Sequence, residues 1–184
     1  MTVKHLDTNE LLAGFEHIKA SPRDSGTVGM IVRRPATDQR EELNSGQLST
    51  ETGLAGDNWF SKGCRGTSDG AAHPDMQLNI MNVRAIQLIA GSRERWSLAG
   101  DQFYVDLDLS EENLPPGTRL GIGTAEIEIT AEPHLGCSKF TARFGRDAML
   151  FVNSQEGKKI RLRGVNAKVI SAGNVGLGDT IERK

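Results

Sequence analysis

The 184-residue chain has a formal net charge of −2, with 37% hydrophobic and 25% charged residues. This balance predicts one folded domain with a sizeable core and excludes a disordered chain. The apolar runs are far too short to span a membrane, and the first residues lack the apolar core of a signal peptide, so we expect a cytoplasmic protein.

The N-terminal part is predicted to hold one helix and one strand. Residues 7–20 carry apolar side chains at helical spacing, with Asp7 or Thr8 as the cap. The sequence SPRDSG then breaks the chain, so residues 1–24 are expected to form a helical extension. Residues 27–35 have the pattern of a strand that ends at a proline.

The middle of the chain alternates turns, strands and a helix. GLAGD at 53–57 predicts a turn, and residues 58–75 form a polar, glycine-rich loop long enough to indicate function or mobility. The next elements are predicted to be a strand at 76–82, a helix at 83–96, and strands at 103–109 and 119–132, the last with a turn or bulge at Gly121 and Gly123.

The C-terminal part returns to short strands. One or two short helices are expected after Cys137, ending near Phe151, and residues 158–183 then have the pattern of strands around glycine turns. No regular β-α-β alternation occurs. The pattern predicts a mainly β, α+β domain over residues 25–184, with a β-barrel core and a few peripheral helices.

Nucleotide-binding signatures are missing from the sequence. The chain has no Walker A motif. GIGTAE fails the dinucleotide fingerprint, because a glutamate stands at the third glycine position and no strand and helix flank it.

Positive charge is concentrated between residues 137 and 170. Eight basic residues stand there against two acidic ones, a local charge of +6 that leaves −8 for the rest of the chain. This excess favours an anionic small molecule, and a solvated basic face is the plainer alternative. Nucleic acid is disfavoured, because the chain is acidic overall and its nine aromatic residues are not interleaved with basic runs.

Cys137, in the segment PHLGCSKF, is the main candidate for chemistry. A free thiol is only about a tenth thiolate at pH 7.5, and nearby positive charge or a helix start increases that fraction. His134, Lys139 and Arg143 are near enough in sequence to act on the sulfur, with His134 as a base or orienting group. A thiolate can carry a persulfide or bind a soft metal. The alternative is a small residue buried in the core.

The second cysteine, Cys64, stands in the flexible segment KGCRG. Two cysteines without a C-x-x-C pair do not predict a disulfide framework. A zinc site made by Cys64, His73, His134 and Cys137 matches no structural zinc spacing, so we do not expect one.

Several short motifs occur in the order found in one known family. They are GLAGD at 53–57, ENL at 112–114, GTRLGIGTAEIEIT at 117–130, CSKF at 137–140 and RGVNAKVISAGNVGLGD at 163–179. Each is weak alone, but their order over residues 25–182 resembles the MOSC domain, named for the C-terminal part of molybdenum cofactor sulfurases. The chain is similar to a small standalone MOSC protein. It lacks the sulfurase part that holds pyridoxal phosphate, so that cofactor is not expected.

The resemblance implies a β-barrel core and a site for molybdenum cofactor (molybdopterin), a pterin dithiolene that bears a phosphate. In the family the cysteine binds molybdenum or carries sulfur, so Cys137 would be the metal ligand and, with His134, the catalytic residue. Arginine binds phosphate bidentately. The basic residues expected to hold the cofactor are Lys139, Arg143, Arg146, Arg161 and Arg163.

Three functions follow from the resemblance. The first is an oxidoreductase that reduces small N-hydroxylated compounds, with the Cys137 thiolate as a ligand to molybdenum. The second is a sulfur carrier or transferase in which Cys137 forms a persulfide, with a cysteine desulfurase as a partner. The third is a non-catalytic cofactor-binding module. A small-molecule substrate, molybdopterin and a redox partner are expected, rather than nucleic acid or a membrane.

Overall fold

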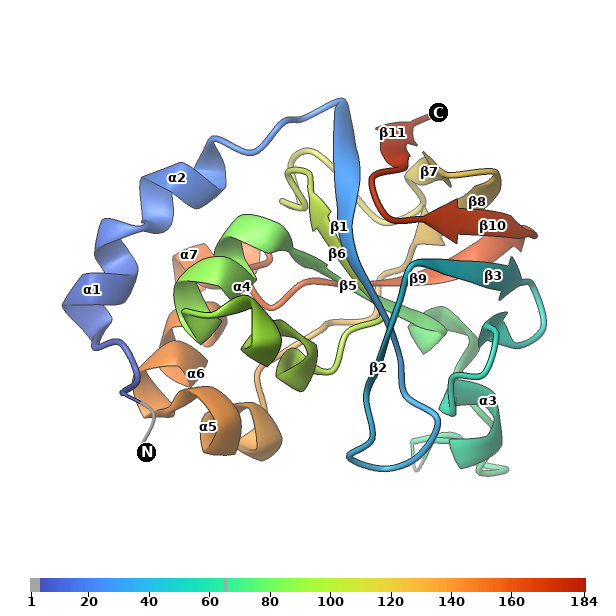
Figure 1. Ribbon diagram of the computed structural model, residues 1–184, viewed down its shortest axis with the longest axis horizontal. Coiled ribbons are helices and arrows are strands. Elements are labelled where there is room, and N and C mark those ends of the chain that lie inside the picture. The colour runs from blue at the N-terminus through green and yellow to red at the C-terminus, as the bar shows by residue number, and fades with distance from the viewer. Residues whose placement is uncertain (1–3, 65) are drawn as a thin grey trace.

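The fold is organised around a closed barrel of seven strands. The computed structural model describes residues 4–64 and 66–184. The strand order is β11-β7-β8-β9-β5-β6-β1, and pairing of β1 with β11 closes the barrel (Figure 1). Only the β5–β6 pairing is parallel among these described strands. The barrel strands are β1 (Ser25–Arg33), β5 (Leu78–Asn82), β6 (Phe103–Asp106), β7 (Arg119–Ile122), β8 (Ala125–Ile129), β9 (Val165–Ser171) and β11 (Thr180–Arg183).

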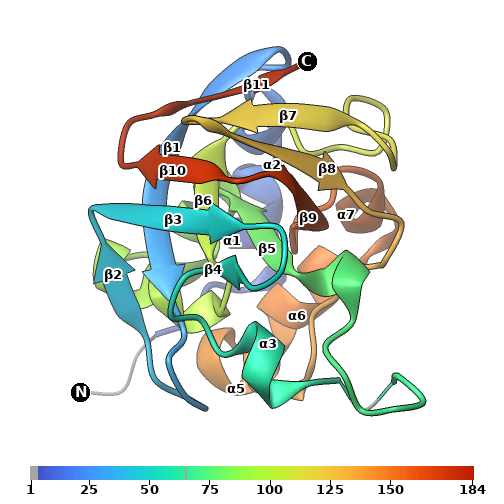
Figure 2. The same cartoon turned by 90° about the vertical axis from the view of Figure 1, so that its right-hand side faces the viewer.

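Four short strands lie outside the closed ring. One of them, β2, pairs with the end of β1. The other three form a small sheet in the order β10-β3-β4, which stands in front of the barrel with α3 below it in the turned view (Figure 2). Their bounds are β2 (Glu41–Leu43), β3 (Ser45–Ser49), β4 (Gly53–Leu54) and β10 (Gly173–Gly176).

The helices gather mostly on one side of the barrel. In Figure 1, α1, α2 and α4 to α7 lie to the left, and α3 lies apart near β4. No helix in the described part of the chain is long and apolar enough to cross a membrane. The bounds are α1 (Thr8–Ala13), α2 (Phe15–Lys19), α3 (Trp59–Lys62), α4 (Val83–Ala90), α5 (Ser138–Phe144), α6 (Arg146–Asn153) and α7 (Gln155–Lys159), with 3-10 turns η1 (Pro74–Met76) and η2 (Arg93–Ala99).

Alternation along the barrel strands creates two apolar cores. Leu78 and Ile80 of β5 point into the barrel, whereas Met81 packs outside it. This follows because successive side chains of a strand point to opposite faces. The outer core is completed by helix residues such as Phe140 and Phe144 of α5. Helix α5 is therefore fixed against the barrel wall by its apolar face.

The predicted barrel with peripheral helices is confirmed, but several boundaries differ. Residues 7–20 form two helices that meet at Gly14, and Asp7 caps the first with a capping box. The predicted loop 58–75 contains α3 and η1. Gly123, with φ of +56°, turns β7 into β8 as a hairpin.

The prediction of strand from residue 158 was wrong, because that stretch completes a helix. Ser154 accepts a 3.0 Å hydrogen bond from the Gly157 amide and starts α7. Arg161 then turns with φ of +51°, and β9 begins only at Val165. The alternation of apolar and polar residues at Ile160, Arg161 and Leu162 resembles that of a strand. The Ser154 cap nevertheless starts a helix just before it.

Candidate functional site

A cleft of about 920 Å³ opens at one end of the barrel. Its walls come from α5, from the loop between β1 and β2, and from the segment around α3. In Figure 1, α5 lies on one side of that loop and α3 on the other. Both sulfhydryl groups of the protein line it, from Cys64 and Cys137, and both are free. Six basic residues share the lining: Arg34, Arg40, Lys62, Lys139, Arg143 and Arg163.

Cys137 is exposed and stands at the N-cap position of α5. Its extended backbone lets its carbonyl accept the first helical hydrogen bond, from the Thr141 amide at 3.0 Å. The thiol makes no capping hydrogen bond. The sulfur is therefore free to react or to bind a ligand, and the alternative of a buried core cysteine is excluded.

Asn153 of α6 fixes the backbone just before this cysteine. Its amide side chain accepts a hydrogen bond from the Gly136 N–H and donates one to the Gly136 carbonyl, both at 2.9 Å. A side chain at position 136 would approach within 2.9 Å of Val152. A larger residue here would force Val152 to shift, and the Gly136–Asn153 pair positions Cys137.

Behind the cysteine, Arg163, Asp101 and His134 form a buried network. Nη1 of Arg163 contacts both oxygens of Asp101, at 2.9 and 2.7 Å, and Nη2 donates to the Ala99 carbonyl at 2.9 Å. The guanidinium also lies 5.1 Å from the centre of the Phe140 ring. Nε2 of His134 lies 3.0 Å from Oδ1 of Asp101, at an angle unsuited to a hydrogen bond.

The network holds one ion pair and one neutral imidazole. Burial alone would raise the pKa of Asp101, but Arg163 and His134 outweigh it and lower that pKa to about 2. Burial and the charge of Arg163 lower the pKa of His134 below its usual value. Asp101 is therefore ionised at pH 7 and His134 neutral, so His134 can accept a proton at the cleft wall.

Arg34, at the end of β1, is held in place from all sides. Its guanidinium forms two 2.8 Å hydrogen bonds with the buried carboxylate of Asp57. Nη1 also donates to Asn79 and to the Gly100 carbonyl, both at 2.9 Å. Asp57 is the last residue of GLAGD, so this motif places the counter-ion of Arg34.

Arg40 and Arg143 stand beside Arg34 with fewer partners. Nη1 of Arg143 donates to the Leu98 carbonyl at 2.8 Å, and Nη2 reaches Asp38. Nε of Arg40 is buried and has no hydrogen-bond partner among the described residues. Burial and the charges of Arg143 and Arg34 lower the pKa of Arg40. Nη1 of Arg40 donates to the Gln39 carbonyl. Nη2, which lies with Nη1 of Arg143 beside Gly100, is therefore the donor left for an anion in the cleft.

Only part of the basic set predicted from sequence meets Cys137 in one cleft. Lys139, Arg143 and Arg163 line it, and so does His134. Arg146 is exposed at the start of α6 and is not among the cleft residues. Arg161 instead lines a neighbouring cavity of about 240 Å³, which shares His134 and Arg163 with the cleft. Its Nη1 donates to the Leu114 carbonyl at 2.6 Å.

Arg34, Arg40 and Cys64 are cleft residues that the sequence analysis did not assign to the site. The two arginines lie in RRPATDQR, directly after the first strand. Basic residues that follow a predicted strand are a signal for this position, but they lie outside the basic 137–170 segment. Cys64 and His73 reach the cleft through the loop after α3, and no local pattern predicts that path.

Comparison with known families decides the classification. Residues 67–182, more than half of the chain, match the sequence model of the MOSC domain. The chain belongs to the MOSC domain family. Its barrel, its exposed Cys137 and the strand-rich C-terminal segment agree with the resemblance of the short motifs. No curated protein matches the chain.

Solved structures extend the agreement to the fold of this MOSC protein. The YUAD protein from Bacillus subtilis is 16% identical, with a TM-score of 0.60 over 86% of this chain and 95% of that one. YiiM from Escherichia coli is 22% identical, with a TM-score of 0.55 over 86% of this chain and 69% of that one. YiiM from Geobacillus stearothermophilus is 13% identical, with a TM-score of 0.52 over 86% and 73%. These identities support the fold alone.

The residues of the cleft fit molybdenum cofactor by their chemistry. In the described part of the chain, no three His, Cys, Asp or Glu side chains converge to hold a bare metal ion. A metal here would therefore rely on the dithiolene sulfurs of its own cofactor, with the exposed thiol of Cys137 as a soft protein ligand. Nη2 of Arg40 and the guanidinium of Arg143 provide donors for a phosphate.

Proposed function

We propose that this MOSC protein binds molybdenum cofactor in the 920 Å³ cleft and reduces small N-hydroxylated compounds. The observation that carries the proposal is the exposed thiol of Cys137, which makes no capping hydrogen bond and lines the same cleft as Arg40 and Arg143. Thiolate suits a soft metal, and arginine suits a phosphate. The substrate class follows from the family resemblance.

Each part of the chain has a separate task in this scheme. Cys137 is the protein ligand to molybdenum, held by the Gly136–Asn153 pair. Arg40 and Arg143 bind the phosphate, while Arg34 stays paired with Asp57. The bound cofactor supplies the two-electron chemistry that the side chains lack.

Proton transfer is assigned to His134. Reduction of an N–OH group to N–H takes up two electrons and two protons and releases water. His134 lines the cleft and is neutral at pH 7, because burial lowers its pKa. It can therefore take up a proton and pass it on, and the ionised Asp101, 3.0 Å from Nε2, stabilises the charged ring.

Molybdenum content tests the proposal directly. Protein produced in cells with the cofactor pathway should contain molybdenum, and protein from cells without it should not. Cys137→Ser should reduce the metal content at least tenfold, because a serine oxygen is a poor ligand for this soft site. Cys64→Ser is the matched control, since it removes the other thiol of the same cleft. Wild-type protein without molybdenum would contradict the proposal.

The exposure of Cys137 also favours a sulfur carrier as a second candidate. In that case the thiolate takes the outer sulfur from a desulfurase persulfide, which leaves the desulfurase thiolate and a Cys137 persulfide. Incubation with a cysteine desulfurase and cysteine, followed by mass spectrometry, decides the question. An adduct of about 32 Da on Cys137 that is lost in Cys137→Ser supports the carrier, and its absence excludes it.

A further inference from the structure

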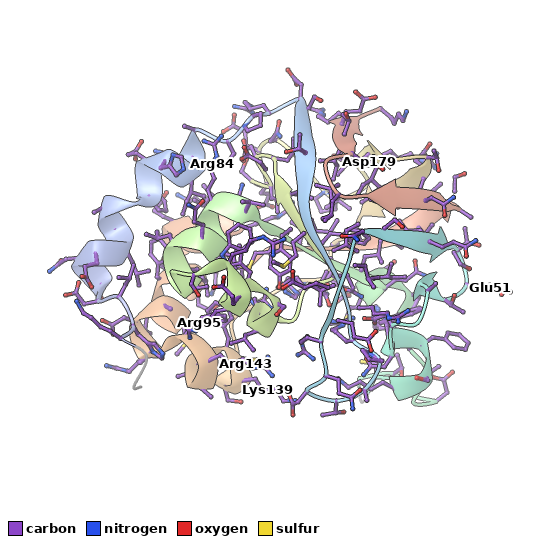
Figure 3. The ribbon with its side chains drawn as sticks, in the orientation of Figure 1. Glu51, Arg84, Arg95, Lys139, Arg143 and Asp179 are labelled. Carbon is purple, nitrogen blue, oxygen red and sulfur yellow. The ribbon has the colours of Figure 1, made fainter. Side chains whose placement is uncertain are left out.

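Asp38 joins the two walls of the cleft at its mouth. It lies in the loop between β1 and β2, and its Oδ1 accepts a 2.8 Å hydrogen bond from Nη2 of Arg143. The same oxygen lies 3.8 Å from Nζ of Lys139. Both cations belong to α5, on the side that faces this loop in Figure 3. The carboxylate therefore occupies donors that line the proposed phosphate site.

The backbone at Asp38 is in an unfavourable conformation. Its φ is +61°, and among the described residues only Asp38 and Arg161 have positive φ without being glycine. L-amino acids avoid this left-handed region, although the short side chain of Asp tolerates it. The Asp38 side chain is also 63% exposed, so its ion pairs contribute little to folding. A residue in a strained conformation whose contacts contribute little to stability points to a functional role.

The surrounding cations need more negative charge than the protein provides. Arg34 is neutralised by the buried Asp57, but Arg40 has no ion-pair partner among the described residues. Nη2 of Arg40 and Nη1 of Arg143 would both lie within 3.8 Å of a side chain placed on Gly100. Two guanidinium groups thus crowd one backbone turn, and the carboxylate of Asp38 contacts one of them, that of Arg143.

We propose that Asp38 is a built-in counter-anion that holds the phosphate end of the cleft until an anionic ligand replaces it. The ligand oxygens take the place of the carboxylate on Nη2 of Arg143 and gain Nη2 of Arg40, which lies beside Arg143 at Gly100. Asp38 then returns to solvent and frees the loop. This inference rests on the proposed anion site and adds its specificity: a neutral group cannot displace the carboxylate.

Asp38→Asn tests the role of the charge. Asparagine keeps the shape and tolerates the left-handed backbone, so the loop should still fold. Removal of the competing carboxylate should tighten the binding of inorganic phosphate about two- to fivefold, as measured by calorimetry in about 0.1 M salt. Asp24→Asn is the matched control. Asp24 precedes the nine-residue strand β1 and Asp38 follows it, so the two lie about 30 Å apart. This separation is about three times the screening length of about 10 Å at 0.1 M salt, so Asp24 should not affect the anion site.

A double-mutant cycle separates competition from a general charge effect. In an Arg143→Gln background, Asp38 has lost its main partner and no longer competes, so the additional Asp38→Asn change should leave phosphate affinity the same. Hydrogen exchange at residues 36–40 should become faster when phosphate binds to the wild-type protein, because the loop is released.

The outcomes distinguish this inference from the proposed site. If the wild-type protein binds phosphate and Asp38→Asn binds it with equal or lower affinity, Asp38 is not a competitor and the anion site remains. If neither protein binds millimolar phosphate, the anion site itself is contradicted, and the inference with it. Binding that appears only in Asp38→Asn would support both.

Discussion

Two groups of charged residues in this protein lie close together but differ in how completely they are paired. Arg163 and Asp101 form a buried ion pair whose donors are taken up by the carboxylate and by the Ala99 carbonyl. Across the same cleft, Arg143 pairs only with the exposed carboxylate of Asp38, and Arg40 has no ion-pair partner among the described residues. Saturated charges fix the structure, because their partners are already provided. Unsaturated charges can exchange a weak internal partner for a ligand.

The largest expected effect on stability comes from breaking the fully paired group, Arg163 and Asp101. Asp101→Asn leaves the buried guanidinium of Arg163 without its counter-ion and should lower the free energy of unfolding by about 3 kcal/mol or more. Urea denaturation measures it. Glu156→Gln is the comparison, because it removes an exposed pair with Lys159 and should lower stability by less than about 1 kcal/mol. Equal effects would contradict the contrast between the groups.

Acid should destabilise the same ion pair. The folded-state pKa of Asp101 is about 2, below its ordinary value of 3.8, so the pair contributes stability above pH 4 that disappears between pH 4 and 2. The difference corresponds to about 2 kcal/mol. Asp101→Asn should remove this part of the acid dependence, as shown by denaturation at several pH values. An unchanged pH profile in Asp101→Asn would show that Asp101 is not the group responsible.

The unsaturated group should respond in the opposite sense, losing binding rather than stability. Arg40→Gln should weaken phosphate binding about tenfold, because it removes charged donors to the anion. Its stability should stay the same or increase slightly, since Arg143 and Arg34 repel Arg40. Arg146→Gln is the matched control, an exposed arginine outside the cleft. If Arg146→Gln weakens phosphate binding and Arg40→Gln leaves it unchanged, the anion site includes Arg146, as the sequence predicted, and not Arg40.

The smallest effect is expected at His134, which lies beside Asp101 of the buried ion pair. Its folded-state pKa is lowered, so the unfolded chain takes up a proton first as the pH falls below about 6.5, and stability falls with it. His134→Gln should flatten the change in stability between pH 7 and 5. Thermal unfolding measured across that range tests it. A steeper dependence in the variant would contradict the neutral imidazole.

The sequence predicts the barrel better than the site. Alternating apolar residues in 76–82 and 119–132 mark strands, because a barrel strand points every second side chain into the barrel. The segment 158–164 was wrongly predicted as strand. Its short alternation of apolar residues suggests a strand, but the Ser154 cap starts a helix that continues into it. Cys137 and Arg143 could be assigned from local context, because they stand on one short helix.

The rest of the site depends on contacts far apart in sequence. Arg40 and Arg143 are more than a hundred residues apart, and the closure of the barrel is what brings them together. Arg163 belongs to the same basic segment as Arg143 but turns inward to Asp101. Charge density along the chain therefore finds the region. It does not separate the arginines that hold the fold from those free to hold a ligand.

The electrostatic character of Cys137 is the central claim, and alkylation rates test it most directly. In Cys64→Ser, the rate with anionic iodoacetate is divided by the rate with neutral iodoacetamide, and a peptide containing GCSKF is the reference. The account predicts a ratio several-fold above that of the peptide, falling in high salt and in Arg40→Gln. A ratio equal to that of the peptide would show that the cleft presents no usable positive charge to the sulfur, and would contradict the account.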